Sequence, residues 1–266
     1  MDITEIMVRA AVDVAQKIDA NAVISFIPGV EVTEKGIEII EVKNLQLDVL
    51  KDLTMSDILE VSERHTLDAI IQLYLRRNYT AGKVVAVFYH AIVVYDIEEG
   101  ANFINLKEYE DVVSRDVLHE VLSIALEIGR EGREGRQIGT AFIIGCDEEV
   151  LKRSHQAVIN PYHSQPEDVR NVMDRSNRES IKEIAQLDGI FIISSEGRII
   201  AAGRYVDTNS RPIQIDSGLG GRHRAAAAIT QDLPVVGVTV SESGGIVRIF
   251  RDGVCKITIG SEVNLK

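Results

Sequence analysis

Residues 187–202, which read LDGIFIISSEGRIIAA, contain the pattern that decides the fold of the second half of the chain. Two apolar runs, 189–194 and 198–202, flank the turn Ser195-Glu196-Gly197. Such runs joined by a glycine-containing turn are typical of a β-hairpin. Asp188 therefore lies at the mouth of the first strand, where a carboxylate can hold a metal ion or accept a proton from a sugar hydroxyl. An Asp-Gly pair is also a common turn.

Helix and strand patterns continue on both sides of this hairpin. Apolar residues at helical spacing predict helices at 113–128, 169–173 and 181–185 before it, and an Ala-rich helix at 222–230 after it. Strands are predicted at 138–145, 234–240, 246–251 and 254–259. The second half is therefore expected to be a mixed, β-rich sheet flanked by helices.

The first half of the chain shows a separate alternation of helix and strand. Helices are predicted around 3–18 and 58–73, and strands at 22–27, 37–42, 83–89 and 91–95. This order is typical of an α/β layer structure. We expect two domains, residues 1–105 and residues 106–266, with no proline- or serine-rich linker between them.

Composition narrows the class of protein. The net charge of −12 disfavours binding along a nucleic-acid backbone but leaves room for a local phosphate site. Cys146 and Cys255 are the two cysteines, lie in apolar runs and are expected to be buried thiols without CxxC spacing. The N-terminal residues lack a signal-peptide pattern, and no run approaches the ~18 apolar residues of a membrane-spanning helix. We expect a cytoplasmic protein that does not bind a membrane.

Residues 218–224, Gly-Leu-Gly-Gly-Arg-His-Arg, form the strongest local signal for chemistry. Glycines let the backbone approach an anion, and the helix that follows directs its free N–H groups to the same place. Arg222 and Arg224 add phosphate donors, and the 100° rotation between helical residues should direct them to nearly opposite sides. The pattern predicts a phosphate site, although it also fits a glycine turn before a surface helix. The Ser241–Gly245 loop is open to both readings, as a hairpin turn or as a pocket wall.

Taken in order, these segments resemble a known family. Asp188-Gly189-Ile190 and Arg222-His223-Arg224 resemble the DGA and RHR motifs of diadenylate cyclase (DAC, DisA_N) domains. Segments at 134–139, 160–162, 203–205 and 241–245 also follow the family's order, so the resemblance covers about residues 108–260. The first half is similar to the α/β domain ahead of the cyclase domain in archaeal DacZ-type proteins, akin to the C-terminal domain of pyruvate kinase. Ile190 stands where the family usually has Ala, and Gly221 where many bacterial members have Thr.

The resemblance implies a metal-dependent diadenylate cyclase that joins two ATP molecules into cyclic di-AMP and releases two pyrophosphates. Each 3′-hydroxyl would attack the α-phosphate of the facing ATP. The implied catalytic residues are Asp188, Arg222, His223 and Arg224, and Asp188 would also hold Mn²⁺ or Mg²⁺. The implied ATP-binding residues are Gly189, Ile190, Val206, Gly220, Gly221, Arg222, His223, Ser241 and Glu242.

The same resemblance implies self-association, and other functions of the phosphate site stay open. Each DAC domain would supply one ATP and half of a site, so two domains must face each other. The first domain is a candidate for oligomerisation or regulation. A regulatory module that binds an adenine nucleotide without turnover, or a different nucleotidyl or phosphoryl transferase, would use the same phosphate site.

Overall fold

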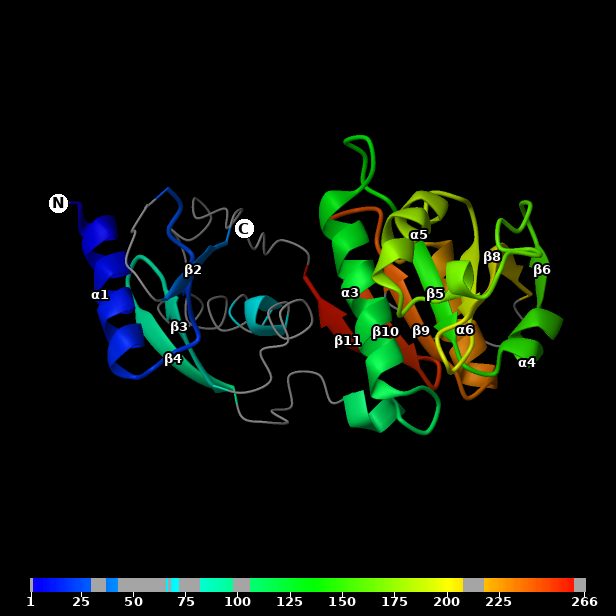
Figure 1. Cartoon of the computed structure of the whole chain (residues 1–266), viewed down its shortest axis with the longest axis horizontal. Coiled ribbons are helices and arrows are strands. Elements are labelled where there is room, and N and C mark those ends of the chain that lie inside the picture. Colours follow the sequence, from blue (N-terminus) through cyan, green and yellow to red (C-terminus); the bar gives the residue numbers. More distant parts are fainter. Residues whose placement is uncertain are drawn as a thin grey trace. The chain divides into compact units, whose positions relative to one another are not determined.

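The computed structural model describes residues 2–29, 37–42, 66, 68–71, 82–97, 106–207 and 218–260. The chain divides into two compact units, residues 1–105 with 262–266, and residues 106–261. Each unit has its own sheet with parallel and antiparallel pairs, together with helices (Figure 1). The predicted α/β fold class is therefore confirmed.

The first unit is built on a four-stranded sheet in the order β2-β1-β3-β4. Its described elements are α1 (Ile3–Lys17), β1 (Ala22–Ser25), β2 (Glu38–Glu41), β3 (Gly82–Val87) and β4 (Ile92–Ile97). Strand β1 pairs in parallel with β2 and β3, and β4 is antiparallel to β3. Of the helix predicted at 58–73, residues 66 and 68–71 are helical, and the others lie outside the described residues.

Alternation along the strands of this first sheet supplies two apolar faces. Val23 and Val85 pack with the apolar stripe of α1, including Val12. Ile24 packs on the other face, in a cluster that contains Ile70. The predicted helical spacing of the N-terminal segment is thereby explained, because it covers one side of the sheet.

The second unit contains a seven-stranded sheet in the order β11-β10-β9-β5-β7-β8-β6. Strands β5 and β7 are parallel, and every other pair is antiparallel. Its elements in chain order are η2 (Leu106–Tyr109), α3 (Arg115–Glu131), β5 (Thr140–Ile144), α4 (Asp147–Lys152), β6 (Ser154–Gln156), η3 (Asp168–Arg170), η4 (Arg175–Asn177), α5 (Arg178–Ile184), β7 (Ile190–Ile193), β8 (Ile199–Val206), α6 (Gly221–Asp232), β9 (Val236–Val240), β10 (Val247–Arg251) and β11 (Val254–Ile259). The hairpin predicted from residues 187–202 is confirmed as β7 and β8.

Both faces of the central strands in this second sheet are apolar. Ile143 belongs to a buried cluster with Ala226 and Ala227 of α6. The neighbouring Phe142 projects to the opposite face and lies beside Phe191, with ring centroids 4.9 Å apart. A central strand buried on both faces reads as a continuous apolar run, which is why β5 and β7 were predictable from the sequence.

Two local predictions for the second half need correction, and two short elements were not predicted. Residues 169–173 do not form a helix: η3 is a single 3₁₀ turn, and the side chain of Asn171 accepts a hydrogen bond from the Met173 N–H, which competes with helical pairing. Helix α4 and strand β6 were not predicted, because they are short and largely polar. Cys146 and Cys255 are exposed free thiols, at the turn into α4 and on the edge strand β11.

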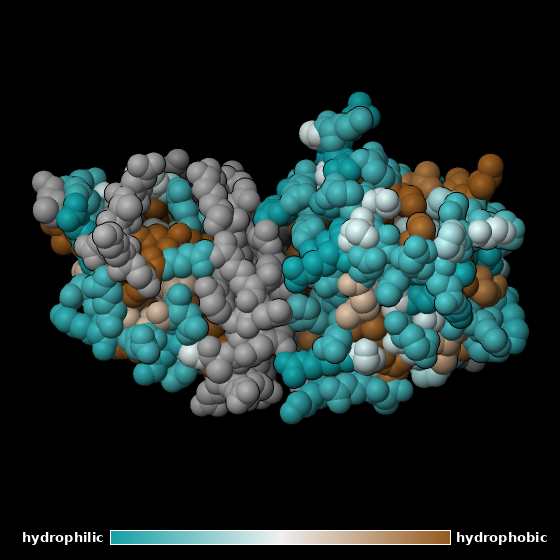
Figure 2. Space-filling model, in the orientation of Figure 1, coloured by the Kyte–Doolittle hydropathy of each residue, from teal (hydrophilic) through white to brown (hydrophobic). Residues whose placement is uncertain are grey.

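Figure 2 shows that the visible face of the second unit is mostly hydrophilic, with apolar residues in small separate areas. Scattered exposed apolar side chains are normal for a folded domain. Among the described residues, no helix combines the length and the apolar character that crossing a membrane requires.

Candidate functional site

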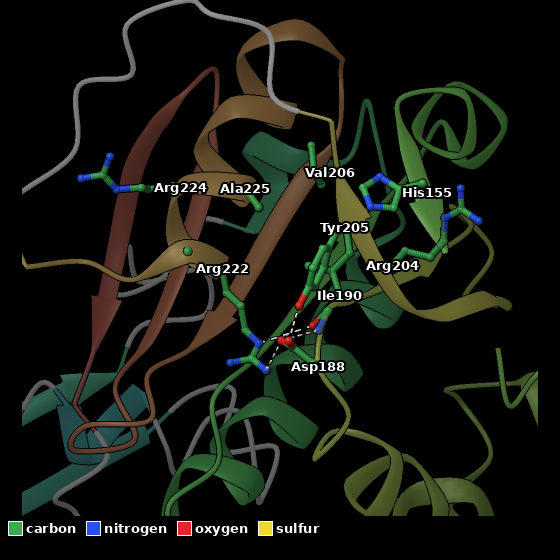
Figure 3. A pocket seen from close by; sticks show the side chains of 11 residues that line it. His155, Asp188, Ile190, Arg204, Tyr205, Val206, Arg222, Arg224 and Ala225 are labelled. Carbon is green, nitrogen blue, oxygen red and sulfur yellow. Dashed lines mark hydrogen bonds and ion pairs between the residues drawn. The ribbon is translucent and has the colours of Figure 1, made fainter. Parts of the chain in front are cut away.

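A pocket of about 520 Å³ opens in the second unit, lined by residues of β6, β7, β8 and the start of α6 (Figure 3). It brings together seven of the residues that were singled out from the sequence. They are Asp188, Gly189, Ile190, Val206, Gly221, Arg222 and Arg224. The carboxylate before β7 and the cationic start of α6, 34 residues apart in the sequence, therefore share one cavity.

Asp188 is held at the edge of this pocket by three donors. Its Oδ1 accepts hydrogen bonds from the Gly189 N–H at 3.0 Å and from Arg222 Nη2 at 3.3 Å. The hydroxyl of Tyr205 donates to Oδ2. These donors, Tyr205 foremost, lower the pKa of Asp188. The carboxylate is therefore ionised at neutral pH, and its side chain is 64% exposed, so it can accept a proton from a bound group.

Gly189 explains why this carboxylate lies so close to β8. Its φ is +105°, and a Cβ at this position would lie 2.6 Å from the backbone nitrogen of Arg204. A larger residue would thus be strained and would push β7 away from β8. Strands β7 and β8 approach each other closely at the Asp-Gly pair, and this places Asp188 beside Tyr205.

Helix α6 supplies the cationic side of the pocket. Arg222, its second residue, donates from Nε to the Gly189 carbonyl at 3.4 Å as well as to Asp188. Figure 3 shows Arg222 directed toward Asp188 and Arg224 directed away from it. The divergence agrees with the expected rotation of about 200° between the two side chains. Arg222 is thus in reach of a ligand in this pocket, and Arg224 extends from its rim.

The structure does not bring the ring of His223 into the pocket. His223 is 5% exposed; its Nε2 lies 3.4 Å from Arg248 Nη1, and its ring meets Phe250 edge-on at 6.2 Å. Burial, with Arg248 and Arg222 nearby, lowers the pKa of His223 to about 4. The structure therefore places the side chain of His223, which the resemblance implied as a catalytic and ATP-binding residue, in the core of the domain and not in the pocket wall. Helical spacing could have predicted the burial of His223, because residues 223, 226, 227 and 230 lie on one side of α6 and are buried.

The buried neutral state of His223 predicts an acid-sensitive fold. The unfolded chain binds the proton near pH 6.5 and the folded chain only near pH 4, so stability is full above pH 6.5 and falls as pH decreases toward 4. We expect His223→Gln to remove about 2–3 kcal/mol of this loss between pH 7 and pH 4.5. Urea unfolding at both pH values measures it, with the exposed His163→Gln as control. An unchanged pH slope in His223→Gln would contradict the prediction.

Gly220, Ser241 and Glu242 do not line the pocket, but Glu242 lies close to it. A Cβ added at Gly139 would be 3.2 Å from Glu242 Cβ and 3.4 Å from Arg222 Nη1. Arg222 is therefore bordered by Asp188 on one side and by the region of Gly139 and Glu242 on another. The Ser241–Gly245 loop belongs to the surroundings of Arg222 rather than to the cavity wall.

Four pocket residues were not assigned a role from the sequence, namely His155, Arg204, Tyr205 and Ala225. His155 of β6 is the register partner of Tyr205 of β8, and both line the cavity. Their contact joins residues 50 apart through an edge strand that has no apolar pattern. Tyr205 belongs to the segment at 203–205, whose position in the family order was the available signal.

The side-chain chemistry of the pocket bears on the binding of a divalent ion. Within the described ranges, no group of three or more His, Cys, Asp or Glu could hold a metal ion. Asp188 is the carboxylate among the pocket residues. Mg²⁺ is commonly bound by one or two carboxylates together with substrate phosphates. The donor set therefore fits an ion that arrives with a phosphorylated ligand.

The fold and the pocket together define an α/β domain in which an arginine at a helix start lies beside a carboxylate. Residues 127–255 match the family described as DisA bacterial checkpoint controller nucleotide-binding (DAC), and residues 6–98 match the probable sensor domain DacZ_A. The second half of the chain is thus similar to the DAC family, and the first half is similar to the DacZ_A domain.

Two curated archaeal proteins are similar to this chain in sequence. A protein named diadenylate cyclase from Methanocaldococcus jannaschii is 38% identical over 165 residues, which are 61% of this chain and 52% of that protein. A protein of the same name from Haloferax volcanii is 35% identical over 150 residues, 55% of this chain and 53% of that protein. The chain matches about half the length of these relatives.

Solved structures also show similarity to this chain. A double mutant of DacA from Staphylococcus aureus is 21% identical with a TM-score of 0.40, covering 59% of this chain and 91% of that one. A hypothetical membrane spanning protein from Bacillus cereus is 15% identical with a TM-score of 0.46, covering 61% of this chain and 71% of that one.

Proposed function

We propose that this protein is a diadenylate cyclase that condenses two ATP molecules into cyclic di-AMP and releases two pyrophosphates. The observation that carries the proposal is the convergence of Asp188 and Arg222 on one pocket. A proton acceptor and a phosphate-binding helix start are the two groups that the reaction needs at one place. The DAC family and the two relatives named diadenylate cyclase support the same activity.

The proposed chemistry starts at the ionised carboxylate. Asp188 accepts the proton of a 3′-hydroxyl, and the oxygen forms a bond to the α-phosphorus of the facing ATP. The bond from that phosphorus to the bridging oxygen breaks, and its electron pair leaves with pyrophosphate. A second, equivalent step closes the ring, so two protons are transferred and two pyrophosphates are released.

Arg222 and the amides at the start of α6 are proposed to bind the triphosphate. In this structure Arg222 neutralises Asp188, and a bound phosphate would compete for the same guanidinium. Gly189 and Ile190 would contact the nucleoside, and Val206 would pack against the base. Mn²⁺ or Mg²⁺, held by Asp188 and phosphate oxygens, would supply charge neutralisation when bound.

The ring closure requires a second ATP, so we propose that two DAC domains face each other through an isologous contact. Arg224 extends from the rim of the pocket and is the candidate for reaching the facing ATP. A role of residues 1–105 in holding this assembly, or in regulating it, is part of the same proposal. ATP is the substrate, with no nucleic acid or membrane as partner.

The divergence of the two arginines predicts different defects for Arg222→Ala and Arg224→Ala. We expect Arg222→Ala to weaken ATP binding about tenfold or more, because it removes a charge-assisted donor inside the pocket. Arg224→Ala should change ATP binding less than about threefold but reduce turnover about tenfold or more. ATP titration and pyrophosphate release measure the two effects, with Lys152→Ala on exposed α4 as control. Equal losses of binding and turnover in both variants would contradict the assignment.

One observation favours a second candidate, an adenine-nucleotide-binding regulatory module without turnover. A Cβ at Gly221 would meet no atom within 4 Å, so none of the described residues fills the place of the family's threonine hydroxyl. Incubation with ATP and Mn²⁺, followed by mass analysis and a pyrophosphate assay, separates the candidates. Cyclic di-AMP with pyrophosphate supports the cyclase, bound but unchanged ATP supports the module, and a product of different mass indicates another transferase.

A further inference from the structure

His155 lies on the wall of the pocket away from Arg224 (Figure 3), and behind the wall it pairs with Asp207. His155 Nδ1 lies 2.6 Å from the Oδ1 of Asp207, the residue directly after β8. The His155 ring also meets Tyr205 edge-on, at 5.9 Å between centroids. Val206, on the same strand, completes an apolar and aromatic wall beside this pair.

Both members of the pair are held by the backbone. The Asp207 N–H donates to the Arg153 carbonyl at 2.8 Å. His155 lies in β6, which pairs antiparallel with β8 and places His155 opposite Tyr205. A side chain on a strand that is fixed in this way can present one ring atom to a ligand with little loss of freedom.

The carboxylate of Asp207 determines which ring nitrogen of His155 carries the proton. An ionised carboxylate only accepts hydrogen bonds, so the neutral ring must donate from Nδ1. Nε2 is then left as an acceptor. Across the described part of the chain, no hydrogen-bond partner occupies Nε2, and His155 lines the cavity.

We propose that His155 determines base specificity by accepting a hydrogen bond from the 6-amino group of adenine. The inference rests on the proposed function, because it requires a nucleotide whose phosphates lie at the start of α6. Its base then lies toward the opposite wall, between Val206 and His155. Guanine has a carbonyl oxygen at position 6, which would face Nε2 as a second acceptor. The site therefore favours a purine that donates at position 6.

The test compares the affinity for ATP with the affinities for GTP and purine riboside triphosphate, which lacks the 6-amino group. Wild type should bind ATP at least about tenfold more tightly than either analogue. His155→Ala should reduce both ratios to within about twofold of unity, mainly by weakening ATP. Asp207→Ala should reduce them in the same direction, because the tautomer is no longer fixed. His163→Ala, an exposed histidine outside the pocket, should keep the wild-type ratios.

The outcomes distinguish this inference from the proposed function. Wild-type protein that makes cyclic di-AMP, with ratios that His155→Ala leaves unchanged, overturns the role of His155 and retains the cyclase. The same is true if His155→Ala weakens all three nucleotides equally, which indicates a general packing role. Wild-type protein that does not bind ATP overturns both proposals.

Discussion

Asp188→Asn is expected to reduce the release of pyrophosphate and cyclic di-AMP about a thousandfold while the protein stays folded. The amide oxygen of Asn can still accept the hydrogen bond from the Gly189 N–H, and its NH₂ group can donate to the Tyr205 hydroxyl, so the geometry of the loop is kept. It cannot take up the proton of a 3′-hydroxyl, and it offers a weaker ligand to a divalent ion. Because the Asp188 side chain is largely exposed, the loss of its ion pair with Arg222 should change the stability by less than about 1 kcal/mol.

Single-turnover formation of product, thermal unfolding and ATP titration measure these effects separately. Tyr205→Phe is the companion variant, since it removes the donor that most lowers the pKa of Asp188. The pKa of the carboxylate then rises, and the acid limb of the rate profile should move to higher pH. Asp188→Asn with more than about a tenth of wild-type turnover would exclude Asp188 as the base.

The core of the site was predictable because its signals are local. Asp188-Gly189 precedes an apolar strand, and residues 218–224 combine glycines, cations and a helix start. Each of these patterns has a chemical use as well as a use in a turn, and the resemblance to one family placed them together. The structure confirms that they meet.

The remaining parts of the site depend on pairing between distant segments. β6 is a three-residue polar edge strand, and only its register with β8 brings His155 beside Tyr205. Asp207, similarly, meets His155 across 52 residues. No periodicity in the sequence marks such contacts, because the side chains are exposed and their spacing is not constrained by a core.

The contact between α3 and α5 also joins distant segments and could not be predicted from the sequence. The apolar residues at 181 and 184–185 predicted α5, but the charged partners of this helix could not be assigned. Arg178 donates from Nε and Nη2 to Glu120 Oε1, at 2.8 and 2.6 Å, and from Nη1 to Glu127. Arg178 and Glu120 are only 18% and 11% exposed. Arg178 is 58 residues from Glu120 and 51 residues from Glu127 in the sequence.

Arg178→Ala is therefore expected to destabilise the second unit by about 3 kcal/mol, because it leaves Glu120 nearly buried without its main donor. Urea unfolding at neutral pH measures the loss. In a double-mutant cycle with Glu120→Ala, we expect a coupling of about 2 kcal/mol, since the double variant no longer buries an unpaired charge. Arg198→Ala is the matched control, because Arg198 pairs with the exposed Glu167 and should contribute less than about 1 kcal/mol.

The loss of the Arg178 contacts should also affect the pocket, because α5 leads directly to Asp188. The helix ends at Ile184, and the Leu187 N–H still donates to the Ile184 carbonyl at 3.0 Å, so the position of Asp188 depends on the anchoring of α5. Well below its unfolding temperature, Arg178→Ala should therefore lower turnover more than ATP affinity, because Arg222 and α6 are unaffected. Loss of stability without any change in turnover would show that Asp188 is held by β7 and Tyr205 alone.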